Sequence, residues 1–144
     1  MKESLQPGLA GTFRYRVPPT KTVPHIYREA PDFQLMPDVL ATGYLVALCE
    51  WAAIELVKPH LDWPSEQSLG TKVALTHTAP TPPGHVIEVS VKVTKVEGRL
   101  LVFEVSAHDG VDPITEGFHE RRVIDSTRFN VKVANKVAAL KGAA

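Results

Sequence analysis

The stretch VLATGYLVALCEWAAIELVK, residues 39–58, decides the fold of this chain. Apolar side chains occur nearly all round a helix drawn through it, so that helix should be buried on most sides. Asp38 can cap its start and Pro59 ends it. Two acids, Glu50 and Glu55, lie inside the stretch, and each would cost about 3 kcal/mol near the centre of a bilayer. We therefore predict the central helix of a soluble core and no membrane segment.

The residues that follow this helix alternate with a period of two, which is typical of β-strands. Prolines and glycines interrupt the pattern, as they do at turns. We expect one strand before the helix, an antiparallel meander of four strands after it, and a loose tail that begins as strand and can turn helical. The expected strands are 12–17, 70–79, 85–96, 100–109 and 114–125, and the loose C-terminal tail is 130–144.

Residues 18–37, between the first strand and the helix, hold five prolines among apolar side chains. Loops of this length are uncommon in a compact domain and are often lids over functional sites. The competing interpretation is a stiff crossing that only covers the core. The apolar residues of this segment include Val23, Ile26, Phe33 and Met36.

A helix that is apolar all round, followed by antiparallel strands, predicts a single α+β domain over residues 1–144, in which the sheet wraps around the helix. This arrangement is the hot-dog fold. One copy leaves a sheet edge unpaired, and a second copy could close it by edge-to-edge pairing. We therefore expect a homodimer, with a tetramer as the further option.

The composition argues against several classes of function. The chain has 144 residues, and its 16 Lys+Arg balance 16 Asp+Glu, so no excess positive charge favours DNA or RNA as a partner. Cys49 is the single cysteine, so no disulfide can form within the chain, and the cytoplasm is the simplest location. The first residues, MKESLQPGLAG, lack the apolar core of a signal peptide.

Glu50 is the residue that a purely structural interpretation explains least, because it sits mid-helix between Cys49 and Trp51. A carboxylate in such an apolar run is costly unless it is paired or used. If it is used, it suits a general base or a nucleophile. The alternative is that Glu50 faces solvent or pairs with a buried arginine.

Three further positions are candidates, each with a structural alternative. His77 ends an expected strand, where it can exchange protons near neutral pH, although a lone histidine is more often structural. Thr42, near the helix start, can bond an acyl oxygen, orient a water molecule or cap the backbone. Gly70 lets the backbone approach a ligand and offers an N–H to an oxyanion, unless it only makes a turn.

The spacing of Thr42 and Glu50 limits how they can cooperate. Eight residues span about 12 Å along a helix, so the two side chains cannot touch if both are helical in one subunit. Either Thr42 precedes the helix, or the two residues act on different parts of one ligand, or the site joins two subunits.

No metal site is expected from the sequence. Cys49 shows no sign of activation and should be an inert buried thiol. The remaining histidines have no metal-ligand spacing, and they are His25, His60, His85, His108 and His119.

The chain also carries a set of motifs that are specific only in combination. They are VPPTKTVPHIY (17–27), APDF (30–33), LATGYLVALCEWA (40–52), SLGTKVALTHTAPTPPG (68–84), VEGRLLVFEVSAHDGVDPI (96–114), HER (119–121) and FNVKV (129–133). In these motifs the chain resembles the fluoroacetyl-CoA thioesterase family of hot-dog proteins.

The resemblance implies an acyl-CoA thioesterase that acts on a small acyl-CoA and needs no cofactor beyond the coenzyme A of its substrate. By motif position it implies that Thr42, Glu50 and His77 are catalytic. It also implies that Gly70 lies near the thioester. The residues implied around the acyl pocket are Val23, Ile26, Phe33 and Met36 of the lid, together with Arg121.

One position departs from the family pattern. The fluoroacetyl-selective member has an aromatic residue where this chain has Met36, and methionine is flexible enough to fill irregular space. The acyl group is therefore left open. Two other classes of function stay as alternatives, which are a non-catalytic acyl-CoA binding module and an enoyl-CoA hydratase. The hydratases resemble one another in an Asp and a His five residues apart, a spacing that this chain lacks.

Overall fold

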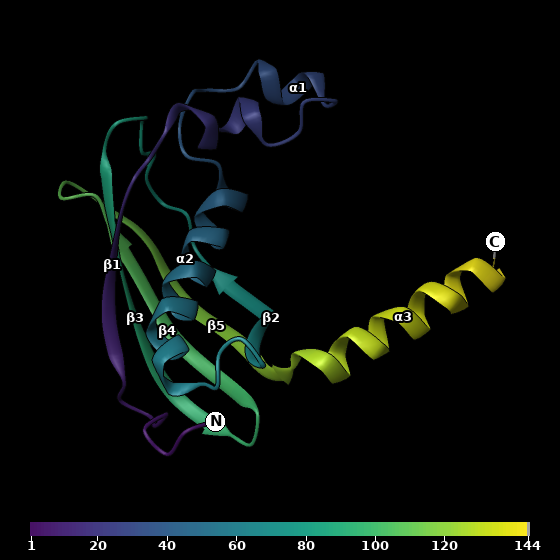
Figure 1. Cartoon of the computed structure of the whole chain (residues 1–144). Helices are drawn as coiled ribbons and strands as arrows, with labels where there is room; N and C mark the ends of the chain where they lie inside the picture. The colour runs from purple at the N-terminus through teal and green to yellow at the C-terminus, as the bar shows by residue number, and fades with distance from the viewer. Residues whose placement is uncertain (144) are drawn as a thin grey trace.

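The computed structural model describes residues 1–143. Its strands form one antiparallel sheet that curves around a long helix (Figure 1). The strands are β1 (Ala10–Arg16), β2 (Glu66–Leu75), β3 (Val86–Glu97), β4 (Leu100–His108) and β5 (Pro113–Asp125). The helices are α1 (Pro31–Gln34), α2 (Thr42–Val57) and α3 (Ser126–Ala143), with single 3₁₀ turns at Pro19–Lys21, Val23–His25 and Lys58–His60.

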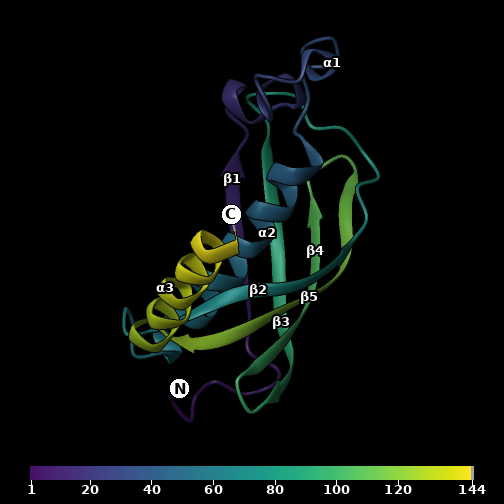
Figure 2. The same ribbon diagram turned by 90° about the vertical axis from the view of Figure 1, so that its right-hand side faces the viewer.

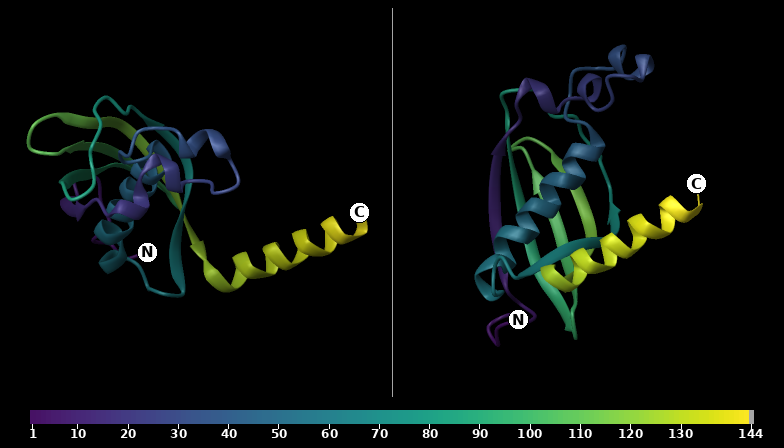
Figure 3. Two further views of the ribbon diagram at one scale, coloured as in Figure 1. Left: turned by 90° about the horizontal axis from the view of Figure 1, so that it is seen from above. Right: turned by 45° about the vertical axis from the view of Figure 1, so that its right-hand side comes forward.

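Helix α2 lies across the concave face of the sheet, whose strand order is β1-β3-β4-β5-β2 (Figures 1 and 3). The prediction that α2 is buried on most sides is wrong for the single chain. One side of the helix is buried against the sheet, whereas Gly43, Ala47 and Trp51 on other sides are exposed. The predicted α+β hot-dog fold is nevertheless confirmed. The buried residues of α2 are Leu45, Leu48, Cys49, Ala52, Ala53 and Val57, and they pack in one core with inward residues of the sheet such as Ile87, Val89, Leu101 and Phe103.

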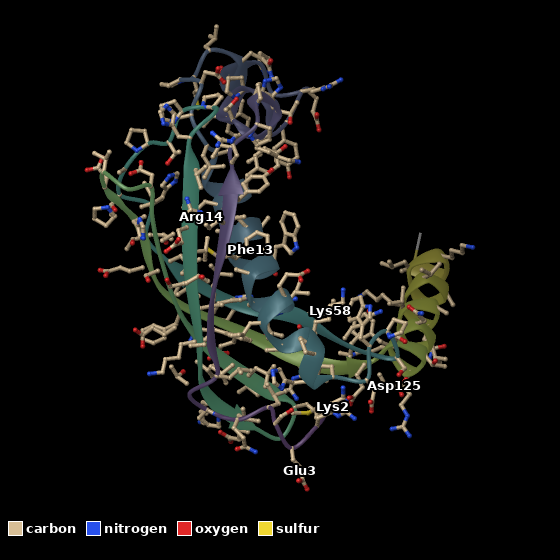
Figure 4. The ribbon with its side chains drawn as sticks, turned by 60° about the vertical axis from the view of Figure 1, so that its left-hand side comes forward. Lys2, Glu3, Phe13, Arg14, Lys58 and Asp125 are labelled. Carbon is tan, nitrogen blue, oxygen red and sulfur yellow. The ribbon has the colours of Figure 1, made fainter. Side chains whose placement is uncertain are left out.

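Strand β1 closes the sheet on one flank of α2. Phe13 points from β1 toward the helix, and its ring centroid lies 4.8 Å from that of Trp51 (Figure 4). Arg14, the next residue, faces away from the helix and pairs with Glu88 at 3.3 Å. The alternation of inward and outward residues is that of a strand with one buried face.

The prediction of a four-stranded meander is wrong in one respect. Strand β2 does not pair with β3, the next strand in the chain, but with β5, where Gly70 lies opposite Arg121. Residues 76–85, which contain Pro80, carry the chain across to the far side of the sheet. As a result β2 is an edge strand, and it runs from residue 66 to 75 rather than from 70 to 79.

The start of α2 also differs from the prediction. The residue before the helix is Ala41, and Asp38 does not cap it. Leu40 instead forms a β-bridge with Thr22, and the Val23 N–H donates to the Val39 carbonyl at 2.9 Å. These contacts keep residues 39–41 extended, so the helix begins at Thr42.

The segment 18–37, expected as a loop, is not a loop throughout. It contains two 3₁₀ turns and α1, and it stands beyond the N-terminal end of α2 (Figure 2). Ile26 reaches down to the helix, because a Cβ placed on Gly43 would lie 2.9 Å from Ile26 Cδ1. The Tyr44 hydroxyl donates to the His25 carbonyl at 3.3 Å. This segment therefore covers the start of α2.

The tail over 130–144 does not begin as a strand, as predicted, because residues 126–143 form one helix, α3; the helical end that the sequence allowed is present. Asp125, at the junction of β5 and α3 (Figure 4), accepts the Arg128 N–H at 2.9 Å and so caps the first turn. The alternation in FNVKV imitates a strand, but the alanines and lysines that follow favour a helix. Helix α3 stands away from the sheet (Figures 1 and 3) and buries no residue. Ala144 lies outside the described residues.

None of the helices described for residues 1–143 is long and apolar enough to span a membrane.

Candidate active site

Glu50 lies on the flank of α2 that faces β2 and β5, and it pairs with Arg121. Arg121 Nη1 donates to Glu50 Oε1 at 3.1 Å. The arginine side chain is 3% exposed, whereas that of Glu50 is 36% exposed. Glu50 is therefore paired with a buried arginine, which was the structural alternative to a catalytic role. The carboxylate nevertheless stays open to solvent on one side, where a substrate could reach it.

Arg121 is also held by hydrogen bonds to β2. Its Nε donates to Ser68 Oγ at 2.8 Å, and its Nη2 donates to the Ser68 carbonyl at 2.7 Å. Burial lowers the pKa of the Arg121 guanidinium, and Glu50 opposes that effect. Since an arginine stays protonated in proteins, Glu50 faces a fixed positive charge.

His119 completes this cluster from the same strand as Arg121. Its side chain is 1% exposed. Its Nδ1 lies 2.9 Å from the Lys72 carbonyl oxygen, and its Nε2 lies 3.0 Å from Arg121 Nη1. Burial lowers the pKa of His119, and the Arg121 charge acts in the same direction. The imidazole is therefore neutral at pH 7.

Gly70 is required where Glu50 meets β2. A Cβ at this position would overlap Glu50 Oε1 and lie 3.2 Å from His119 Cε1. The missing side chain therefore leaves room for the carboxylate directly against the strand. The structure thus explains the glycine at position 70 by steric crowding, which the sequence alone does not reveal.

Thr42 and His77 form a second polar pair at the start of α2. Thr42 Oγ1 lies 2.8 Å from His77 Nδ1. His77 Nε2 is buried and finds no hydrogen-bond partner within residues 1–143. Burial lowers the pKa of His77, so its ring is also neutral at pH 7. This pair can exchange a proton with a ligand that reaches the buried nitrogen.

The two clusters lie on one stripe of α2 but do not meet within the chain. Thr42 is the first residue of the helix and Glu50 follows two turns later, about 12 Å along the axis. Val46 lies between them at the same four-residue spacing. Thr42 is therefore inside the helix. Thr42 and Glu50 can still cooperate in two ways: they can bind different parts of one ligand, or they can belong to a site shared by two subunits.

Among the predicted lid residues, Ile26 reaches the first turn of α2, at Gly43. Val23, Ile26 and Phe33 are partly buried, and the Phe33 ring stacks on Tyr27 at 6.2 Å. Met36 is 45% exposed, on the outer part of the segment. The position that departs from the family pattern is thus open to solvent in the single chain.

A cavity of about 220 Å³ lies on the opposite flank of α2, toward β1. Its lining includes Tyr15, Tyr44 and Trp51, and it includes none of the predicted site residues.

Cys49 lies in the core, where burial raises its pKa to about 12, so the thiol is no nucleophile at neutral pH. Within residues 1–143 no three His, Cys, Asp or Glu side chains gather as metal ligands do.

Sequence reasoning missed His119 and Ser68. His119 lacks metal-ligand spacing, and Ser68 precedes the strand predicted over residues 70–79. One signal could have found the histidine, since it occupies the same face of an alternating strand as Arg121, two residues on. Nothing in the sequence pairs Ser68 with that strand.

Comparisons with known proteins identify the family of this chain. A family model for fluoroacetyl-CoA-specific thioesterase matches residues 20–127. The chain is 49% identical over 139 residues to a fluoroacetyl-CoA thioesterase of Streptantibioticus cattleyicolor, and the match covers 96% of this chain and 99% of that protein.

Solved structures extend the similarity to three dimensions. A structure of a fluoroacetyl-CoA thioesterase superposes with a TM-score of 0.88 at 49% identity, covering 92% of this chain and 97% of that chain. A mutant of a fluoroacetyl-CoA-specific thioesterase in complex with fluoroacetate and CoA gives a TM-score of 0.84 at 49% identity, covering 87% and 99%. A thioesterase-superfamily protein of Thermus thermophilus gives 0.82 at 23% identity, covering 96% and 97%, and supports the fold alone.

The family match covers most of the chain and includes the strands and the helix that carry both polar clusters. The chain therefore belongs to the fluoroacetyl-CoA-specific thioesterase family, and it is a thioester hydrolase of the hot-dog fold.

Proposed function

We propose that this protein hydrolyses a small acyl-CoA, of which fluoroacetyl-CoA is the first candidate, to the free acid and CoA. The observation that carries the proposal is the Glu50 carboxylate, which is held by buried Arg121 and stays partly exposed. The relative from Streptantibioticus cattleyicolor supports the substrate class.

Glu50 supports two routes of attack on the thioester. As a general base it takes a proton from water while the water oxygen bonds to the carbonyl carbon. As a nucleophile it bonds to that carbon itself, and water then cleaves the resulting anhydride. In both routes the carbon–sulfur bond breaks, and CoA leaves as a thiolate that takes up a proton with the help of His77.

The other residues stabilise charge and position the acyl group. We assign the Gly70 N–H to the carbonyl oxygen as negative charge develops there. Thr42 is assigned to the acyl group or the attacking oxygen through its hydroxyl, which His77 orients. Because a thiolate is a good leaving group, the reaction requires neither a metal ion nor an organic cofactor. We place the activity in the cytoplasm, where acyl-CoA substrates and reduced Cys49 are expected together.

The two polar clusters are proposed to meet in a homodimer. Strand β2 is an edge of the sheet, and pairing it with a second copy would close that edge. Glu50 lies against Gly70, and Thr42 bonds His77, so the midpoint between the clusters falls at Val46 on α2 and Val73 on β2. Val73 is 42% exposed although it faces the same side of the sheet as His119.

A two-fold axis beside this midpoint would join the halves of the site. Residues on the axis meet their own copies, and the apolar side chains of Val46 and Val73 suit such a contact because they carry no charges to repel one another. The two-fold axis would place Glu50 and Gly70 of one protomer beside Thr42 and His77 of its partner. One ligand could then touch both clusters at each of two equivalent sites.

Helix α3 supports a second copy on this side of the molecule. It leaves the sheet beside β2 and extends past that edge (Figures 1 and 3). Phe129, Val133, Val137 and Leu140 fall on one stripe of the helix, and the last three are exposed in the single chain. A protomer paired along β2 would lie where it can cover that stripe.

Mixing two impaired variants tests the shared site. Glu50→Ala and Thr42→Ala are unfolded and refolded together, with each variant refolded alone as the control. If the site joins two protomers, heterodimers hold one intact site, and random assortment restores roughly a quarter of wild-type activity. No recovery from a verified heterodimer would show that both clusters act within one protomer.

The substrate class is tested by following CoA release from acetyl-, fluoroacetyl-, propionyl-, butyryl-, hexanoyl- and benzoyl-CoA. Turnover of one short acyl-CoA well above the others supports the proposal. Binding of acyl-CoA without any release would favour the non-catalytic binding module. Hydration of an enoyl-CoA by the same preparation would favour the hydratase class instead.

A further inference from the structure

We propose that His119, as a neutral imidazole protonated at Nδ1, is a positioning residue that holds Arg121 and thereby the Glu50 carboxylate. The proposal rests on the proposed catalytic function of Glu50. It gives a role to a buried histidine that the reaction itself does not use.

The hydrogen bonds of His119 fix both its charge and its tautomer. The Lys72 carbonyl oxygen can only accept, so the proton must be on His119 Nδ1, 2.9 Å away. Arg121 Nη1 can only donate, so His119 Nε2, 3.0 Å away, must carry no proton. One form of the ring satisfies both partners, and it is the neutral form.

The same geometry explains why this ring matters for Glu50. Arg121 Nη1 carries two hydrogens, and it has two acceptors, His119 Nε2 and Glu50 Oε1. When one hydrogen points at the histidine, the plane of the guanidinium is set and the other points at the carboxylate. The bonds from Nε and Nη2 to Ser68 secure the opposite side of the group.

Protonation of His119 would undo this arrangement. Every element packed on the ring faces it with a defined group: Arg121 from β5, Glu50 from α2, the Lys72 carbonyl from β2 and, on β4, the Phe103 ring at 6.1 Å. A second proton would set an N–H against Arg121 Nη1 and put two positive charges side by side. Glu50 and Glu120 attract that proton, but burial and Arg121 oppose it more strongly.

The test compares two substitutions of the ring. His119→Phe keeps its shape and its stacking on Phe103 but removes the acceptor, whereas His119→Gln keeps an acceptor that does not titrate. We expect the Phe variant to lose about tenfold or more in kcat with KM within about threefold, and the Gln variant to recover most of that loss. The exposed His108→Gln serves as the control and should match the wild type.

The pH dependence of kcat separates positioning from a merely structural role. Activity of the wild type should fall on the acid side as His119 gains its second proton, and this fall should be shallower or shifted in His119→Gln but unchanged in His108→Gln. Nitrogen NMR of the wild type should show His119 protonated at Nδ1 alone at pH 7.

The outcomes distinguish the two proposals. A folded His119→Phe variant with wild-type kcat, or a ring protonated at Nε2 at pH 7, would overturn the role of His119 while the hydrolase activity stands. A wild-type protein that releases no CoA from any acyl-CoA would overturn the proposed function of Glu50 itself.

Discussion

Glu50 and Thr42 lie on the same stripe of α2, two turns apart, but the protein holds them in different ways. Around Glu50, the buried side chains of Arg121, His119 and Ser68 form an interlocked set of hydrogen bonds. Around Thr42, a single hydrogen bond joins an exposed threonine to His77.

The difference indicates a division of labour. A carboxylate whose partner is fixed by three hydrogen bonds to other residues is organised before substrate binds, which is what a base or nucleophile requires. A hydroxyl with one partner can adjust to the acyl group that arrives. We therefore expect changes near Glu50 to reduce kcat steeply and changes near Thr42 to have smaller effects.

Removal of Arg121 should break the first cluster most completely. Arg121→Leu leaves Glu50, Ser68 and His119 without their shared partner, so we expect kcat to fall by about a hundredfold or more and stability to fall by about 2 kcal/mol. The measurements are CoA release and urea unfolding. Arg122→Leu is the matched control, since Arg122 is exposed on the other face of β5, and it should change neither value. Equal effects of the two variants would contradict the division of labour.

Gly70→Ala should displace Glu50 without removing any polar group. The added Cβ overlaps Glu50 Oε1, and the partly exposed carboxylate can move away. We expect kcat to drop by about thirtyfold with little loss of stability. Gly142→Ala, where a Cβ meets nothing within 4 Å, should behave as the wild type. Full activity of the Gly70→Ala variant would show that the carboxylate need not lie against β2.

Thr42→Val should test the adaptable pair. The change keeps the shape of the side chain but removes the hydroxyl that bonds His77, and we expect a loss of about tenfold in kcat/KM. Thr42→Ser keeps the hydroxyl and should lie close to the wild type. If the valine variant loses as much activity as Arg121→Leu, activity depends equally on the two clusters, which would contradict the division of labour between them.

The smallest expected effect is on stability in mild acid. Burial lowers the pKa of both His77 and His119 in the folded protein, so between their lowered values and about 6.5 the unfolded chain binds protons that the folded chain does not. Stability should therefore be complete above about pH 6.5 and decline as the pH falls through this window. Thermal unfolding from pH 7.5 to 5 measures it. His119→Gln should flatten the decline more than His77→Gln, because His119 is more deeply buried; the reverse order would contradict this ranking.

Local sequence patterns predicted the parts of the fold that local interactions determine. The helix through residues 42–57 follows from a long apolar stretch that ends at a proline, and most strand positions follow from alternation with a period of two. The partner of β2 could not be predicted in this way, because pairing with β5 joins residues far apart in the chain. The alternation in residues 129–133 suggested a strand, but Asp125 caps a helix there.

The candidate site divides in the same manner. Glu50 stood out because a charge in an apolar helix requires a reason, whereas Arg121 entered only through the family resemblance. His119 and Ser68 could not be recognised, because their importance comes from contacts across β2 and β5 that appear only when the chain is folded.

The central claim is that the Glu50 carboxylate, held by Arg121, performs thioester hydrolysis. Its most direct test measures fluoroacetyl-CoA binding and CoA release for the wild type and Glu50→Gln, a substitution that keeps the shape but removes the negative charge. We predict that Glu50→Gln still binds the acyl-CoA and releases CoA at least about a hundredfold more slowly. A folded Glu50→Gln variant that releases CoA at the wild-type rate would contradict the claim.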